Sequence, residues 1–129
     1  MTPELLALTL AVLLQGVQFV LYSALAQKQV GTKYAASPRD EPRQLTGTAG
    51  RAQRALNNHF ESLALFTPAV LVITLADKST AFTAACAWVY LAARLLYVPA
   101  YLMGWAPGRS LIWVAGFLAT MAMLLAALI

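Results

Sequence analysis

The sequence predicts an all-α integral membrane protein, built as a four-helix bundle whose helices run up and down. Hydrophobic residues make up 60% of the 129 residues, charged residues only 11%, and the mean hydropathy is +0.68. Soluble domains carry about 25% charged residues. Several apolar runs are long enough to cross a bilayer. A chain of this length forms one domain, so we expect a single transmembrane domain over residues 1–129.

The first predicted span covers residues 4–26. Pro3 and Glu4 suit a helix start, because proline fits the first turn and an acid is favourable at the positive end of the helix dipole. Gln15 and Gln18 lie three residues apart on one helix face. We expect both to point toward protein rather than lipid, either in interhelical hydrogen bonds or as the lining of a site.

Three further spans follow a long polar stretch. Residues 28–50 contain several glycines and prolines and are expected to form a loop. The second span is predicted over residues 54–76, and Pro68 within it can kink the helix. Short polar turns then separate a third span over residues 80–103 from a fourth over residues 109–129.

Basic residues are concentrated at one side of the predicted bundle, which sets its orientation. The turn before the fourth span holds Arg109, whereas the opposite side has only Lys78. The first loop and the start of the second span carry Lys28, Lys33, Arg39, Arg43, Arg51 and Arg54. By the positive-inside rule, the first loop is cytoplasmic and both termini lie on the opposite side. Basic residues that flank apolar helices fit this role and anionic lipid head groups, so the net charge of +4 does not indicate nucleic acid.

A dense polar patch opens the second span. Residues 51–61 read RAQRALNNHFE and are followed by fifteen uncharged residues. Glu61 lies roughly 10 Å of helix rise beyond Arg54, on the way into lipid. An ionisable group at that depth usually marks a functional site or an ion pair. The residues that share this helix face are Arg54, Asn57, Asn58 and Glu61, and Arg51 extends the row by one turn.

Arg94 is a second charge inside the predicted bilayer. It lies roughly 15 Å from the turn at Gly104, a depth similar to that of Glu61. Opposite charges at one depth on two helices predict an Arg94–Glu61 ion pair, since each alone would be expensive. Such a pair could also serve only to lock the helices together.

Tyr97, Tyr101 and Ser110 can form hydrogen bonds and lie toward the same membrane face as Arg94. Arg109 lies at a helix start, where a positive charge is unfavourable for the helix dipole, so either membrane topology or a ligand explains its presence. Together these residues predict a cationic crevice for a small anionic ligand with carboxylates and amides. No metal site is expected, because His59 has no partner ligands, and Cys86 is expected to be a small buried residue. The crevice residues are Arg94, Tyr97, Tyr101, Arg109 and Ser110.

These motifs resemble those of the MAPEG family, the membrane-associated proteins of eicosanoid and glutathione metabolism. The pattern Arg51-x-x-Arg54-x-x-x-Asn58-x-x-Glu61 is similar to the family signature. The pattern Arg94-x-x-Tyr97-x-x-x-Tyr101 resembles its third helix, and Ala106-Pro107-Gly108-Arg109-Ser110 resembles the start of its fourth. Two separated motifs match in order and in spacing.

The resemblance implies a homotrimer of four-helix subunits that binds glutathione between neighbours near the cytosolic face. Arg109 would activate the thiol, and Lys28 could meet a neighbour's glutathione. Trp113 and Ser62 stand where some members carry an aromatic hydroxyl, so the resemblance does not extend to the eicosanoid specificities. The implied glutathione ligands are Arg54, Asn58, Glu61, Tyr97, Tyr101 and Arg109, with Asn57 as a further candidate, and we place Arg94 and Ser110 in the same site.

The expected function is that of a membrane-embedded, glutathione-dependent transferase or peroxidase. Its substrates would be lipophilic electrophiles or hydroperoxides that arrive through the bilayer. A thiol has a pKa of about 8.5 and is therefore mostly protonated at neutral pH. An adjacent guanidinium would favour the thiolate, which is the reactive form. The alternative is a non-catalytic membrane bundle that binds lipid or a protein partner. A transporter is less well supported, since four spans leave little room for alternating access.

Overall fold

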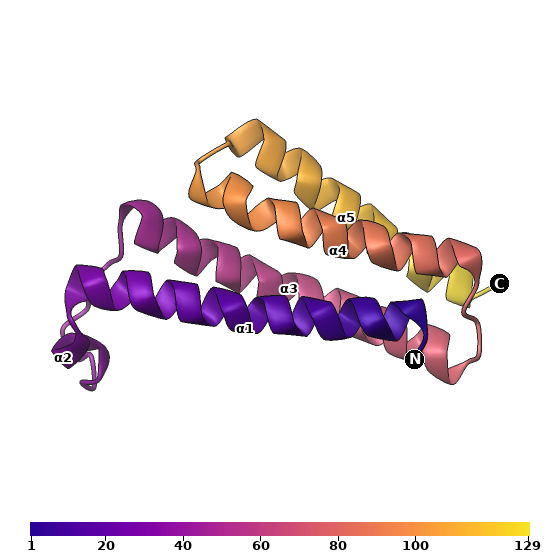
Figure 1. Ribbon diagram of the computed structural model, residues 1–129, viewed down its shortest axis with the longest axis horizontal. Coiled ribbons are helices and arrows are strands. Elements are labelled where there is room, and N and C mark those ends of the chain that lie inside the picture. The colour runs from indigo at the N-terminus through magenta and orange to yellow at the C-terminus, as the bar shows by residue number, and fades with distance from the viewer.

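The computed structural model describes residues 1–129 as four long helices that run side by side (Figure 1). A short helix, α2, lies in the first loop at Thr32–Ala35. The structure contains no strands, and each long helix is long and apolar enough to cross a membrane. The predicted all-α four-helix fold is therefore confirmed. The long helices are α1 at Pro3–Val30, α3 at Gly47–Leu75, α4 at Ala81–Leu102 and α5 at Ala106–Ala127.

Helix starts follow local capping chemistry. The Thr2 hydroxyl accepts a hydrogen bond from the Leu5 amide at the start of α1. Thr80 and Thr83 form a capping box at the start of α4. Gly31 ends α1 with a φ of 89°, a conformation that a side chain would strain.

Three helices extend beyond the predicted spans. α1 continues to Val30, α3 begins at Gly47 rather than at Arg54, and α5 begins at Ala106 rather than at Arg109. Hydropathy marks only the part of a helix that meets lipid, whereas hydrogen bonding continues the helix into water. The expected loop over residues 28–50 is therefore shorter, and Gly50 lies inside α3.

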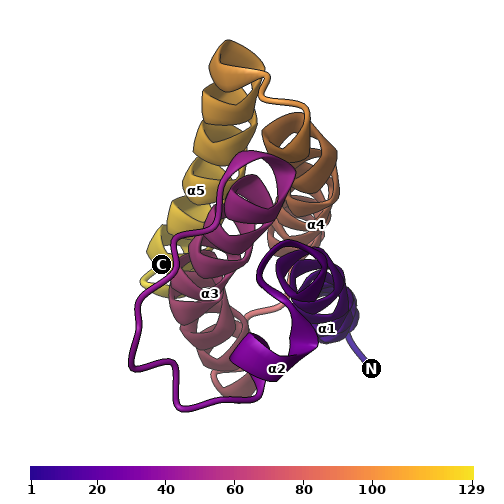
Figure 2. The same ribbon diagram turned by 90° about the vertical axis from the view of Figure 1, so that its left-hand side faces the viewer.

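Both chain ends lie at one end of the bundle, and the first loop and the α4–α5 turn lie at the other (Figure 1). In the end view, α1 packs beside α3 and α4, and α5 packs against α3 and α4 on the far side (Figure 2). The centre of the bundle is filled by Phe66, Ile73, Tyr90 and Met123, which are fully buried. Phe66 and Tyr90 stack with their ring centroids 3.7 Å apart.

The outer surface of the bundle is strongly apolar. Large side chains such as Val20, Leu96 and Leu111 are more than half exposed. Helices satisfy their own backbone hydrogen bonds, so such a surface suits contact with lipid tails. Gln15 and Gln18 point inward as predicted, but neither amide atom of Gln18 has a hydrogen-bond partner.

A buried carboxylate links two helices at the end of the bundle where the chain termini lie. Glu4 is fully buried and accepts hydrogen bonds from the hydroxyls of Ser79 and Thr83, the latter at 2.6 Å. These contacts tie the start of α1 to the start of α4, where the helix dipole also favours a negative charge. The sequence predicted a role for Glu4 only at the start of its own helix.

Candidate functional site

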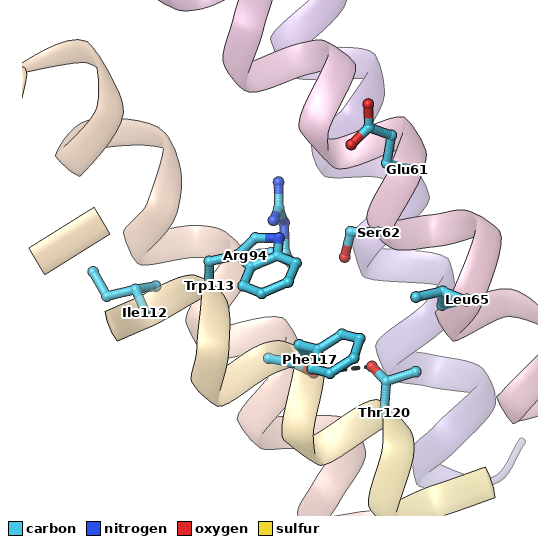
Figure 3. Close-up of a pocket in the computed structure, with 9 residues that line it drawn as sticks. Glu61, Ser62, Leu65, Arg94, Ile112, Trp113, Phe117 and Thr120 are labelled. Atoms are coloured by element: carbon cyan, nitrogen blue, oxygen red, sulfur yellow. Dashed lines mark hydrogen bonds between the residues drawn. The ribbon is translucent and has the colours of Figure 1, made fainter. Parts of the chain in front are cut away.

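Two adjoining cavities lie between α3, α4 and α5. The larger cavity measures about 330 Å³ and the smaller about 170 Å³, and Trp113 borders both. Figure 3 shows the smaller cavity, with Trp113 and Phe117 on α5 facing Ser62 and Leu65 on α3. The larger cavity is lined by Asn58, Tyr97, Tyr101, Arg109, Ser110, Trp113 and Val114. The smaller is lined by Glu61, Ser62, Leu65, Arg94, Ile112, Trp113, Gly116, Phe117 and Thr120.

Tyr101 is the meeting point of three helices at the larger cavity. Arg54 of α3 donates a hydrogen bond from Nε to the Tyr101 hydroxyl at 3.2 Å. Arg109 of α5 lies with its guanidinium carbon 4.5 Å from the centroid of the same ring. A cation over an aromatic face is attracted by the ring quadrupole. One tyrosine of α4 therefore brings two arginines, which are 55 positions apart by number, to one cavity.

Arg94 forms a second, buried cluster about two helical turns before Tyr101. Only 2% of this residue is exposed. Its Nη1 donates to Oδ1 of the Asn58 side chain at 2.8 Å, and its Nε lies 3.4 Å from Nδ1 of His59. The guanidinium carbon also sits 4.3 Å from the Tyr97 ring centroid, and Nη2 has no partner. These contacts offset the high free energy of a guanidinium removed from water.

The predicted Arg94–Glu61 ion pair is wrong for the single chain. Arg94 donates to Asn58 and to His59 instead, and Glu61 is exposed. Both residues border the smaller cavity, but their charged groups are separate there (Figure 3). Matching depth is not enough for contact, because Asn58 and His59 lie nearer to Arg94 and already satisfy two of its nitrogens.

The structure gathers most of the predicted site residues and leaves two outside. Asn57 and Lys28 are exposed and border neither cavity. Arg54 borders neither cavity but reaches the larger one through its hydrogen bond to Tyr101. The residues that line the two cavities are Asn58, Glu61, Arg94, Tyr97, Tyr101, Arg109 and Ser110.

Comparison with known protein families decides what kind of protein this is. The MAPEG family model matches residues 6–129, nearly the whole chain. The chain belongs to the MAPEG family. Comparison with curated proteins and with solved structures gave no match. The resemblance seen in the sequence motifs is thus confirmed, and this MAPEG protein is an integral, multi-pass membrane protein of a family concerned with eicosanoid and glutathione metabolism.

The contacts of His59 and Ser62 in this MAPEG protein were not predicted from the sequence. His59 is fully buried and bridges α1 to Arg94. The Ser62 hydroxyl hydrogen-bonds the Tyr90 hydroxyl at 2.8 Å. The buried position of His59 could have been found, because Leu56 and Leu63 at i−3 and i+4 mark the core face of α3. Its partners could not, since they lie on other helices.

Proposed function

We propose that this MAPEG protein binds glutathione at the two cavities and uses it as a transferase or peroxidase. The observation that carries the proposal is the convergence of Arg54 and Arg109 on Tyr101, beside Asn58 and Ser110. This arrangement concentrates positive charge and hydrogen-bonding groups at one end of a membrane bundle. A small, water-soluble anion is the ligand that such a place favours.

The residues fit the chemical groups of glutathione. A carboxylate of the tripeptide matches the guanidinium group of Arg54, which can bind a planar anion through paired hydrogen bonds. The amides of glutathione match the side chain of Asn58. Its ammonium group matches Glu61, the one acidic residue that lines the cavities.

Arg109 is the residue we propose to act in catalysis. Bound glutathione supplies a thiol, which is nucleophilic as its thiolate. Arg109 stacks on Tyr101 at the start of α5, and this contact holds its guanidinium at the larger cavity. A guanidinium beside sulfur stabilises the thiolate, and each unit by which the thiol pKa falls corresponds to about 1.4 kcal/mol.

The apolar side of the smaller cavity is suited to a lipophilic second substrate. Leu65, Ile112 and Phe117 give it apolar walls, and it lies among three membrane helices. A lipophilic electrophile or hydroperoxide would reach it from the bilayer. Its border with the larger cavity at Trp113 would bring such a compound close to the thiol.

We further propose a homotrimer with sites between neighbouring subunits, in which the first loop is cytoplasmic. Asn57 and Lys28 are exposed and have no role at the cavities of their own chain. Both are therefore free to contact the glutathione of a neighbouring subunit. The apolar outer surface of α1 and α5 can pack against a second copy as well as against lipid.

Isothermal titration of the detergent-solubilised protein with glutathione tests the proposal. We expect saturable binding that Arg54→Ala weakens and that Arg43→Ala leaves unchanged, since Arg43 stacks on Tyr34 in the first loop, away from the cavities. Assays with an aryl halide and a lipid hydroperoxide then separate transferase from peroxidase activity. Absence of glutathione binding by the parent protein would overturn the proposal in favour of a non-catalytic bundle that binds lipid or a protein partner.

A further inference from the structure

His59 occupies the point where α1, α3 and α4 meet. The side chain is fully buried. Its Nε2 lies 2.9 Å from the backbone carbonyl oxygen of Ala11 in α1, and its Nδ1 lies 3.4 Å from Nε of Arg94 in α4. The imidazole thus connects the backbone of one helix to the guanidinium of another.

These two contacts are compatible with only one form of the ring. A carbonyl oxygen can only accept, so Nε2 of His59 must carry the hydrogen that is donated to Ala11. An arginine Nε can only donate, so Nδ1 must offer a lone pair to Arg94. The neutral Nε2–H tautomer meets both requirements. The Nδ1–H tautomer would set two acceptors against each other at Ala11 and two donors against each other at Arg94. An imidazolium would place its positive charge beside that of Arg94.

The position of the Arg94 guanidinium depends on His59 and Asn58 together. Asn58 holds Nη1 and His59 holds Nε, so two nitrogens are fixed from adjacent positions of α3. The Tyr97 ring covers one face of the guanidinium. Nη2 is the remaining nitrogen without a partner, and Arg94 borders the smaller cavity.

We propose that His59, as the neutral Nε2–H tautomer, is a positioning residue that fixes Arg94 against the backbone of α1 for the reaction at the cavities. The proposal rests on the proposed function for its kinetic consequences, but the tautomer and the contact with Arg94 do not depend on glutathione. The competing explanation is that His59 only fills space in the core. That role would keep the contact of Nε2 with Ala11 but would not require Nδ1 to accept a hydrogen bond from Arg94.

Nitrogen NMR can read the tautomer directly, because His59 is the only histidine of the chain. Selective ¹⁵N-histidine labelling therefore reports one imidazole. At neutral pH we expect a protonated Nε2 and an unprotonated Nδ1. Arg94→Met should move the Nδ1 resonance, while Leu56→Ala, a buried substitution one turn away on α3, should leave it in place.

The parent spectrum alone can overturn the proposal, so a variant that fails to fold does not weaken the test. A hydrogen on Nδ1, or an imidazolium at neutral pH, would contradict it. An Nδ1 resonance that Arg94→Met leaves in place, or that Leu56→Ala moves equally, would show that His59 does not sense Arg94.

Kinetics of two His59 variants provide the functional arm. A glutamine carboxamide can donate from nitrogen to Ala11 and accept at oxygen from Arg94, whereas leucine can do neither. His59→Leu should lower kcat by about tenfold or more, as expected when a charged group near a reaction loses its position. His59→Gln should recover most of this loss, with Leu56→Ala as the control for a purely packing defect.

Equal losses of kcat in His59→Gln and His59→Leu, in folded proteins, would overturn the positioning role. If the parent has no glutathione-dependent activity but shows the expected tautomer and the shift in Arg94→Met, the proposed function fails and the positioning of Arg94 by His59 is supported.

Discussion

At the scale of single residues, two arginine clusters lie at the cavities. Tyr101 brings Arg54 and Arg109 together at the larger cavity, and Asn58 and His59 hold Arg94 beside the smaller one. The first cluster is partly exposed and suited to a ligand, whereas the second is buried and mostly satisfied within the chain. The two clusters should therefore respond differently to substitution.

Substitutions at Arg109 and Arg54 should separate catalysis from binding. If Arg109 stabilises the thiolate, Arg109→Leu will lower kcat more than it weakens glutathione binding, because the interaction strengthens along the reaction path. Arg54→Ala will mainly weaken glutathione binding, with a smaller loss of kcat at saturation. Steady-state kinetics with titration calorimetry measure both effects. The roles would be reversed if Arg54→Ala had the larger effect on kcat.

Glu61 and Arg94 should differ in their effect on stability. Glu61 is exposed, so Glu61→Gln will change the free energy of unfolding in detergent by less than about 0.5 kcal/mol. Arg94→Met leaves Oδ1 of Asn58 and Nδ1 of His59 without their donor, which should lower that free energy by about 1–3 kcal/mol. Denaturant titration measures both changes. A large loss of unfolding free energy in Glu61→Gln would indicate that Glu61 is ion-paired after all, which would contradict the structure.

The residue types of the site could be predicted from sequence, but their partners could not. Spacing on α3 placed Arg54, Asn58 and Glu61 on one face, and helix rise placed Arg94 at the depth of Glu61. Depth says nothing about rotation of one helix relative to another. That rotation turns Arg94 toward Asn58 and His59 and leaves Glu61 at the cavity.

At the scale of helices, contacts between polar groups fix how the elements pack. Glu4 joins the start of α1 to the start of α4 at one end of the bundle. At the other end, Arg51 of α3 donates from Nε to the carbonyl oxygen of Leu102 at 2.9 Å and so caps the end of α4. α4 is thereby held at both ends while it presents Arg94, Tyr97 and Tyr101 to the cavities.

Loss of the Glu4 contact should loosen the packing of α1 on α4. Glu4→Ala removes an acceptor that Ser79 and Thr83 share in a buried place. Hydrogen bonds to a charged group contribute about 1.5–3 kcal/mol, so the free energy of unfolding should fall by about 2 kcal/mol. Glu41→Ala, in the exposed first loop, is the matched control. Equal stability of the two variants would show that Glu4 is not a clamp.

At the scale of the whole molecule, the sequence predicted four spans and their up-down order, and the structure confirms both. Apolar runs of bilayer length are a strong signal because lipid permits few other structures. Helix ends were placed less well, since capping and not hydropathy sets them. Assembly could not be predicted from composition, because the apolar surface that lipid requires also suits a neighbouring subunit.

Cysteine labelling in intact cells should confirm the orientation of the bundle. Starting from Cys86→Ala, which removes the only native cysteine, single cysteines at Lys33 or Arg43 should react only after the membrane is permeabilised. A cysteine at Ile129 should react from outside. The excess of basic residues in the first loop is the reason. Reaction of the Ile129 position only after permeabilisation would reverse the topology.

The most direct test of a glutathione enzyme is the thiolate of the bound tripeptide. Its ultraviolet absorbance should be followed against pH in the parent and in Arg109→Leu. If Arg109 stabilises the thiolate, the absorbance of bound glutathione will appear at lower pH in the parent than in the variant. In the parent it will also appear below the pKa of a free thiol, which is about 8.5. Identical titration curves, each matching free glutathione, would contradict the activation of glutathione at this site.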